Sequence, residues 1–89
     1  MDTEAKHILV VDDDTRLRSL LQRFLRESGF FVSVANGAAA ARHLMQQYKF
    51  DLLIVDIMMP EESGLEFLAK LRQDNLIPVI LLTAMGETA

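Results

Sequence analysis

The chain of 89 residues contains no cysteine. It therefore has no disulfide framework, no thiol nucleophile and no thiolate metal ligand. Positive charge is also in short supply, because 9 Lys and Arg stand against 13 Asp and Glu and give a net charge of -4. Binding to a nucleic-acid backbone depends on an excess of cations. We therefore expect no direct binding of nucleic acid by this segment.

Long apolar runs are missing as well. The longest run, over residues 76–82, is interrupted by Pro78, whereas a membrane-spanning helix needs about 20 apolar residues. The amino terminus carries two acidic residues before the apolar run 8–11, and that run is too short for the apolar part of a signal peptide. We expect no membrane partner and, because the lack of cysteine fits a reducing compartment, a cytoplasmic location.

The composition is that of a globular domain, with 51% apolar and 25% charged residues,. A chain of this length supports one small domain with a modest core. No repeat, linker or low-complexity tract divides the sequence. We therefore expect a single domain over residues 1–89.

Short apolar runs alternate with amphipathic segments along the chain. Runs rich in β-branched residues predict strands over 8–11, 31–35, 52–55 and 77–82,. Apolar residues at helical spacing predict helices over about 14–28, 38–48 and 65–72,. Short strands joined by helices form parallel pairs, with helices on both faces of the sheet. The predicted fold class is α/β.

Several local features accompany this pattern. Asp14 is expected to cap the first helix, and Gly29 to end it in the left-handed conformation,. The pair Asn36-Gly37 predicts a turn with positive φ. The first helix is expected to bury an apolar stripe made of Leu17, Leu21, Phe24 and Leu25.

Acidic side chains stand where the predicted strands end. Asp12 and Asp13 follow the first strand, Asp56 follows the third, and Thr83 follows the fourth. These ends meet at one edge of a parallel sheet if the second and third strands flank the first. Two carboxylates about 4 Å apart repel by roughly 4 kcal/mol at an effective dielectric near 20, so such a cluster needs a cation or a proton. Oxygen ligands alone favour Mg²⁺ over Zn²⁺.

Three motifs in this arrangement resemble the receiver domain of two-component response regulators. They are VVDDD at 10–14, DIMMPEESG at 56–64, which fits Asp-x-x-x-Pro-x-x-x-Gly, and the dipeptide TA at 83–84,. The resemblance implies a flavodoxin-like, doubly wound parallel sheet with strand order 2-1-3-4-5. It also implies a signalling phosphoacceptor rather than an enzyme with a separate substrate.

The resemblance implies a role for each site residue. Asp56 would take a phosphoryl group from the phosphohistidine of a histidine kinase or a phosphotransfer protein. Mg²⁺ would be bound by Asp13, Asp56 and the backbone carbonyl of Met58, with Asp12 in the outer shell. Thr83 would donate a hydrogen bond to a phosphoryl oxygen. The signal would pass to an output, which in many relatives is transcription regulation through an attached DNA-binding domain.

Part of the family pattern has no counterpart in these 89 residues, namely the fourth helix, the fifth strand with its lysine, and the fifth helix. Neither Lys49 nor Lys70 fits the place of that lysine, so we expect this segment to lack a group that full activity needs. We therefore expect a partial receiver domain that belongs to a longer protein and that self-associates, because its last strand and first helix are left uncovered.

Less specific interpretations remain beside this one. Glu61 and Glu62 are expected to form a solvated loop face. A magnesium-dependent phosphatase resembling the haloacid dehalogenases would need Asp-x-Asp-x-Thr, but Thr15 follows Asp14 directly, one position early,. A receiver-like domain that signals by binding alone, without phosphate, is the other alternative.

Overall fold

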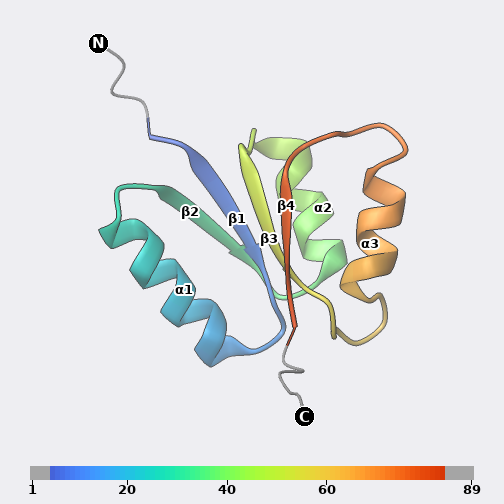
Figure 1. Ribbon diagram of the computed structural model, residues 1–89, viewed down its shortest axis with the longest axis horizontal. Coiled ribbons are helices and arrows are strands. Elements are labelled where there is room, and N and C mark those ends of the chain that lie inside the picture. The colour runs from blue at the N-terminus through green and yellow to red at the C-terminus, as the bar shows by residue number, and fades with distance from the viewer. Residues whose placement is uncertain (1–4, 84–89) are drawn as a thin grey trace.

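The computed structural model describes residues 5–83, and strands and helices alternate throughout them (Figure 1). All seven expected elements are present. In chain order they are β1 (His7–Val11), α1 (Thr15–Glu27), β2 (Phe31–Ala35), α2 (Ala38–Gln47), β3 (Leu52–Asp56), α3 (Gly64–Leu71) and β4 (Val79–Leu82).

The four strands form one parallel sheet in the order β2-β1-β3-β4. This order places β1 at the centre, where Val10 pairs with both Val34 and Ile54. The described strands thus match the first four positions of the expected flavodoxin-like order, and the α/β fold class is confirmed. No helix among residues 5–83 has the length and apolar character that a membrane span requires.

Two apolar cores lie on the two faces of the sheet. Because successive strand residues point to opposite faces, Leu9 and Val11 pack toward α2 and α3, whereas Ile8 and Val10 pack toward α1. Figure 1 shows α1 on one side of the sheet and the helix pair α2 and α3 on the other. The α2–α3 side holds the larger set of buried residues, which includes Phe67.

Helix α1 is less buried than the sequence suggested. None of its residues is buried, although Leu21 and Leu25 pack against the sheet. Phe24 is 62% exposed and Leu17 is 37% exposed, so their assignment to the core was wrong. Within residues 5–83, α1 covers its face of the sheet alone. Only the stripe that faces β1 and β2 is therefore packed.

The ends of the elements follow local capping chemistry. The carboxylate of Asp14 accepts hydrogen bonds from the backbone N–H groups of Arg16 and Leu17 at 3.0 and 3.2 Å, so the predicted cap of α1 is confirmed. Gly29 has the expected positive φ of 101°. At Gly37 the prediction was wrong, because its φ of 176° is ordinary extended backbone and the residue begins α2 as its N-cap.

Strand β4 begins at Val79, two residues later than expected. Pro78 has no N–H to donate to a neighbouring strand. Its carbonyl still accepts a hydrogen bond from the Leu53 N–H at 3.0 Å, which sets the register of β4 against β3.

Candidate metal and phosphoryl site

The three acidic residues meet at one edge of the sheet. Asp12 and Asp13 follow β1, and Asp56 is the last residue of the neighbouring strand β3. One carboxylate oxygen from each of the three lies within 4.8 Å of the other two. The carboxyl ends of β1, β3 and β4 all point to this edge (Figure 1). The convergence expected from the sequence is therefore present.

Asp12 is buried, with 1% of its surface exposed. Its Oδ1 accepts a hydrogen bond from the Asp14 N–H at 2.9 Å, whereas no described residue donates to its Oδ2. Burial raises the pKa of Asp12 above its usual value, and the negative charges of Asp56 and Asp13 raise it further, although the Asp14 N–H opposes the shift. A buried carboxylate oxygen without a partner is costly, so this atom is suited to a cation or to water bound on one.

The other two acids face solvent to different degrees. Asp13 is exposed and Asp56 is half-buried. The Oδ1 of Asp56 accepts a long hydrogen bond, 3.3 Å, from the N–H of Met58. Met58 itself is exposed and lies in the loop that follows β3. Oxygen ligands that remain open to water suit Mg²⁺, which keeps part of its hydration shell.

The backbone beside Asp56 is fixed by Gly64, the first residue of α3. The Gly64 N–H donates to the Ile57 carbonyl at 2.9 Å. A Cβ atom at Gly64 would lie 2.2 Å from the carbonyl oxygen of Asp56, a distance that no side chain tolerates. The start of α3 therefore approaches the acidic site this closely only because residue 64 is glycine.

Thr83 lies directly after β4, at the same edge of the sheet. Its side chain is exposed. Together with Asp12, Asp56 and residues of α1, it lines a hollow of about 240 Å³. The structure therefore places Thr83 within the site region, and its motif neighbour Ala84 lies outside the described residues.

Glu62 does not belong to a solvated loop face, contrary to the prediction. Its side chain is only 18% exposed and forms ion pairs with Arg42 of α2 and Lys70 of α3. Glu61, in contrast, is exposed, with a φ of 72°. Sequence patterns could not reveal the partner of Glu62, because Arg42 is 20 residues away and belongs to another helix.

Comparison with known proteins identifies the family. The sequence model of one protein family, the response regulator receiver domain, matches residues 8–89. Protein PetR of Rhodobacter capsulatus is 47% identical over 88 residues, which cover 99% of this chain and 37% of PetR. Transcriptional regulatory protein CpxR of Escherichia coli is 47% identical over 80 residues, which cover 90% of this chain and 34% of CpxR. The chain thus spans about a third of the length of these curated relatives.

Solved structures agree with the sequence match. A response regulator receiver protein from Pseudomonas putida has a TM-score of 0.86 at 30% identity, covering 97% of this chain and 72% of that one. Response regulator TrrA from Thermotoga maritima was solved in complex with Mg²⁺ and BeF. It has a TM-score of 0.80 at 39% identity, and the match covers 91% of this chain and 71% of TrrA. Sequence, strand order and fold therefore agree that the chain belongs to the response regulator receiver domains of two-component signalling.

Proposed function

We propose that this chain receives a phosphoryl group on Asp56 from the phosphohistidine of a histidine kinase or a phosphotransfer protein. The observation that carries the proposal is the cluster of three carboxylates within 4.8 Å of one another. Membership of the receiver family supports it. The modified domain would then switch an output, and the names of two relatives, transcriptional regulatory protein CpxR and probable transcriptional regulator ycf29, point to transcription regulation as that output.

The residues present fit a hard divalent cation. The donor atoms are carboxylate and carbonyl oxygens, with no sulfur or imidazole nitrogen among the three clustered acids,. In this proposal Asp13, Asp56 and the backbone carbonyl of Met58 would hold Mg²⁺, and the buried Oδ2 of Asp12 would act from the outer shell. The structure of TrrA with Mg²⁺ and BeF supports this choice of ion.

The chemistry is a transfer from nitrogen to oxygen. A carboxylate oxygen of Asp56 attacks phosphorus, the P–N bond of the donor breaks, and its electron pair returns to the imidazole. A carboxylate nucleophile has no proton to lose, so Asp56 needs no general base. Bound Mg²⁺ supplies charge neutralisation between the carboxylate and the phosphoryl oxygens. The Thr83 hydroxyl donates to one of those oxygens, and the Met58 N–H helps to orient Asp56.

The intact mass of the Mg²⁺-loaded protein after treatment with a small phosphodonor tests the proposal. We expect the mass to rise by one phosphoryl group, and the Asp56→Asn variant to show no increase. Asp74→Asn is the matched control, because Asp74 is an exposed acid just after α3. Uptake of phosphate by Asp56→Asn, or loss of uptake in both variants, would contradict the assignment.

We propose, further, that residues 1–89 make up the amino-terminal part of a receiver domain. The support is that the chain spans 71–72% of the solved receiver chains described above. The mass experiment should therefore be run on this chain and on a longer chain that carries it. Uptake by the longer chain alone would assign an essential group, such as the family's lysine, to the added segment.

A further inference from the structure

The loop between β3 and α3 carries Met58 and connects the acidic site to the α2–α3 side of the sheet. The loop is fixed at its two ends, because the N–H of Gly64 donates to the carbonyl of Ile57 at 2.9 Å. Met59 is buried in the core. The next two residues, Pro60 and Glu61, are exposed. Their position therefore depends on whatever holds the loop between Met59 and Gly64.

Glu62 connects the middle of this loop to helices α2 and α3. The guanidinium of Arg42 on α2 donates to both carboxylate oxygens of Glu62, at 2.7 and 2.5 Å. The Nζ of Lys70 on α3 lies 3.5 Å from the same carboxylate. Two parallel, charge-assisted hydrogen bonds to arginine fix direction as well as distance. The lysine is more exposed and adds attraction without such geometry.

Arg42 is itself held in place. Its Cζ lies 5.2 Å from the centroid of the Phe67 ring, over a side chain that is only 1% exposed. The guanidinium therefore stacks on a core side chain, and this contact favours the orientation that faces Glu62. The hydrogen bonds from Arg42 lower the pKa of Glu62, so the pair stays ionised at neutral pH.

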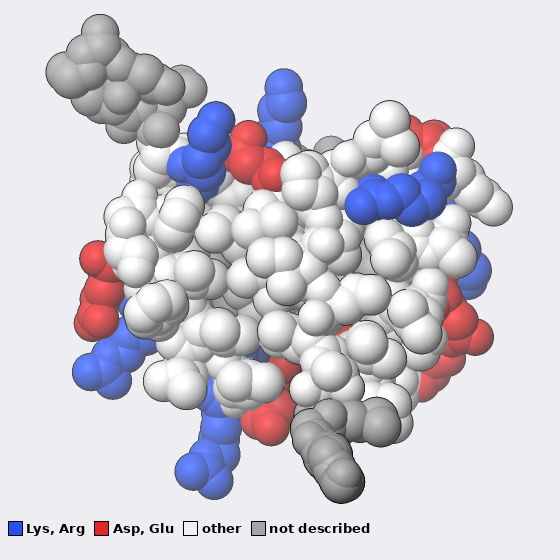
Figure 2. Space-filling view, in the orientation of Figure 1, with Lys and Arg blue, Asp and Glu red and all other residues white. Residues whose placement is uncertain are grey.

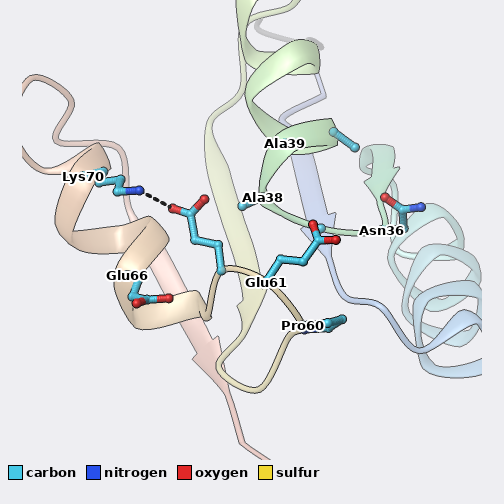
Figure 3. Close-up of a pocket in the computed structure, with 10 residues that line it drawn as sticks. Asn36, Ala38, Ala39, Pro60, Glu61, Glu66 and Lys70 are labelled. Atoms are coloured by element: carbon cyan, nitrogen blue, oxygen red, sulfur yellow. Dashed lines mark ion pairs between the residues drawn. The ribbon is translucent and has the colours of Figure 1, made fainter.

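Beside this ion pair the loop borders open space. A hollow of about 500 Å³ lies between the first turn of α2 and the loop, with Asn36 and Ala39 on one side and Pro60 and Glu61 on the other. Figure 3 shows Glu61 across the hollow from Asn36, and the Lys70–Glu62 ion pair as a dashed line. Because little packing supports the loop on this flank, the loop has room to move if Glu62 is released.

We propose that the Arg42–Glu62 ion pair is a positioning device for the phosphoacceptor site, holding the loop so that Met58 stays beside Asp56. The inference rests on the proposed function, since Met58 matters only if its backbone binds the metal. Arg42 and Glu62 touch neither metal nor phosphate in this account, and they act through the backbone of residues 57–63.

The test is a titration of Mg²⁺ alone, followed by NMR at the amides of Asp13 and Met58, with Glu62→Gln and Arg42→Gln. Electrostatics alone would change Mg²⁺ affinity in opposite directions, because one variant removes a negative charge and the other a positive one. Positioning predicts weaker binding in both, by roughly tenfold, as for residues that orient metal ligands. Amide exchange of residues 58–62 in metal-free protein should become faster in both variants.

Three further variants complete the design. The exchange of charges in Arg42→Glu with Glu62→Arg should recover only part of the affinity, because the new positive charge would face Lys70. Arg42→Lys should also keep only part of it, because lysine cannot donate two parallel hydrogen bonds. The control is Arg23→Gln with Glu27→Gln, which removes an exposed ion pair of 3.6 Å on α1 and should leave Mg²⁺ binding unchanged.

Two results would overturn the inference and leave the proposed function intact. The first is a Mg²⁺ affinity that changes in opposite directions in Glu62→Gln and Arg42→Gln. The second is a Mg²⁺ affinity that stays at the level of the unsubstituted protein in both variants. The same holds if the α1 control weakens Mg²⁺ binding as strongly. Absence of Mg²⁺ binding in the unsubstituted protein would instead overturn the proposed function, and the inference with it.

Discussion

Adjacent acids at the end of β1 lie in opposite environments. Asp12 is buried with one oxygen unpartnered, whereas Asp13 is exposed. The N–H of Asp12 still donates to the Ala35 carbonyl at 3.1 Å and so continues the pairing of β1 with β2, whereas Asp13 lies in the loop before α1. Burial raises the pKa of Asp12, so its ionised form opposes folding.

Asp12→Asn should stabilise the metal-free protein at neutral pH. Burial raises the pKa of Asp12 above 3.8 in the folded state, so the folded protein holds this proton more tightly than the unfolded chain. Stability is then lost as the pH rises from about 3.8 through the folded pKa. Asparagine carries no such penalty. Urea unfolding with a chelator should show a gain over the unsubstituted protein that disappears toward acidic pH. A gain independent of pH, or one equalled by Asp74→Asn, would contradict this.

Asp13→Ala should abolish the stabilisation by Mg²⁺. An ion that binds only the folded state at about 100 times its Kd adds roughly 2.7 kcal/mol to the free energy of unfolding. Thermal unfolding with Mg²⁺ and with a chelator measures this increment. Asp14→Asn is the control, because it removes an equal charge next in sequence and keeps an N-cap,. An undiminished increment in Asp13→Ala would exclude Asp13 as a ligand.

Gly64→Ala should cost about 1–3 kcal/mol, the usual range for forcing an extra carbon into a packed site. The added Cβ would lie 2.2 Å from the Asp56 carbonyl oxygen, and the backbone on either side would have to separate. Chemical denaturation measures the loss. At Gly37 a Cβ meets nothing within 4 Å, so Gly37→Ala should stay within about 1 kcal/mol. Equal costs at the two positions would show that the close approach is not limiting.

For individual residues, the sequence could predict which acidic side chains converge, but not how far each of them is buried or which partner it has. Asp12, Asp13 and Asp56 are found from strand ends and motif spacing alone. The Arg42–Glu62 ion pair depends on how α2 and α3 pack, and no local signal marks it. The interpretation of Glu62 as a solvated residue failed for this reason.

Among the elements, α1 shows that amphipathic spacing does not measure burial. Its apolar stripe was predicted correctly as a helix, yet the burial of each residue depends on what packs beside it. Leu21 and Leu25 contact the sheet, whereas Leu20 and Phe24 are each 62% exposed. Strands and helices were predictable because their signals are local. Which face of each helix or strand is covered by other residues was not predictable, because it depends on how the elements pack.

In the monomer, Phe24→Ala should therefore lower the free energy of unfolding by less than about 1 kcal/mol, as for surface positions. Phe67→Ala removes a side chain that is 1% exposed and should cost about 3–5 kcal/mol. Both are measured by urea unfolding of the same protein. Similar losses at the two positions would mean that Phe24 is buried in solution, against a neighbouring helix or a second copy.

The molecule as a whole presents an uncharged face. Figure 2 shows that the centre of this view, over β4 and the α1 side of the sheet, has almost no charged side chains. On β4, Ile80 is 49% exposed. Among the described strands β4 pairs only with β3. Unpaired apolar edges are templates for pairing with another chain.

We expect this chain to form dimers or larger assemblies at micromolar concentration, through the β4 edge or the α1 face. Sedimentation velocity measures the distribution. Ile80→Lys should shift it toward monomer, because a charge on an edge strand disfavours pairing. Leu76→Lys is the control, since Leu76 is 85% exposed but precedes the strand. A compact monomer that unfolds cooperatively would refute the expectation.

The central position of β1 sets the order in which the molecule can be assembled during synthesis. Among the four described strands β1 leaves the ribosome first, yet His7 pairs with Phe31, and Ile8 pairs with Leu52. At about 5–20 residues per second, β1 waits some seconds for its second neighbour. Every later strand then joins the edge of an existing sheet. Asp12, Asp13 and Asp56 come together when β3 docks, before β4 is needed, so affinity for Mg²⁺ should arise in the nascent chain ahead of the completed sheet.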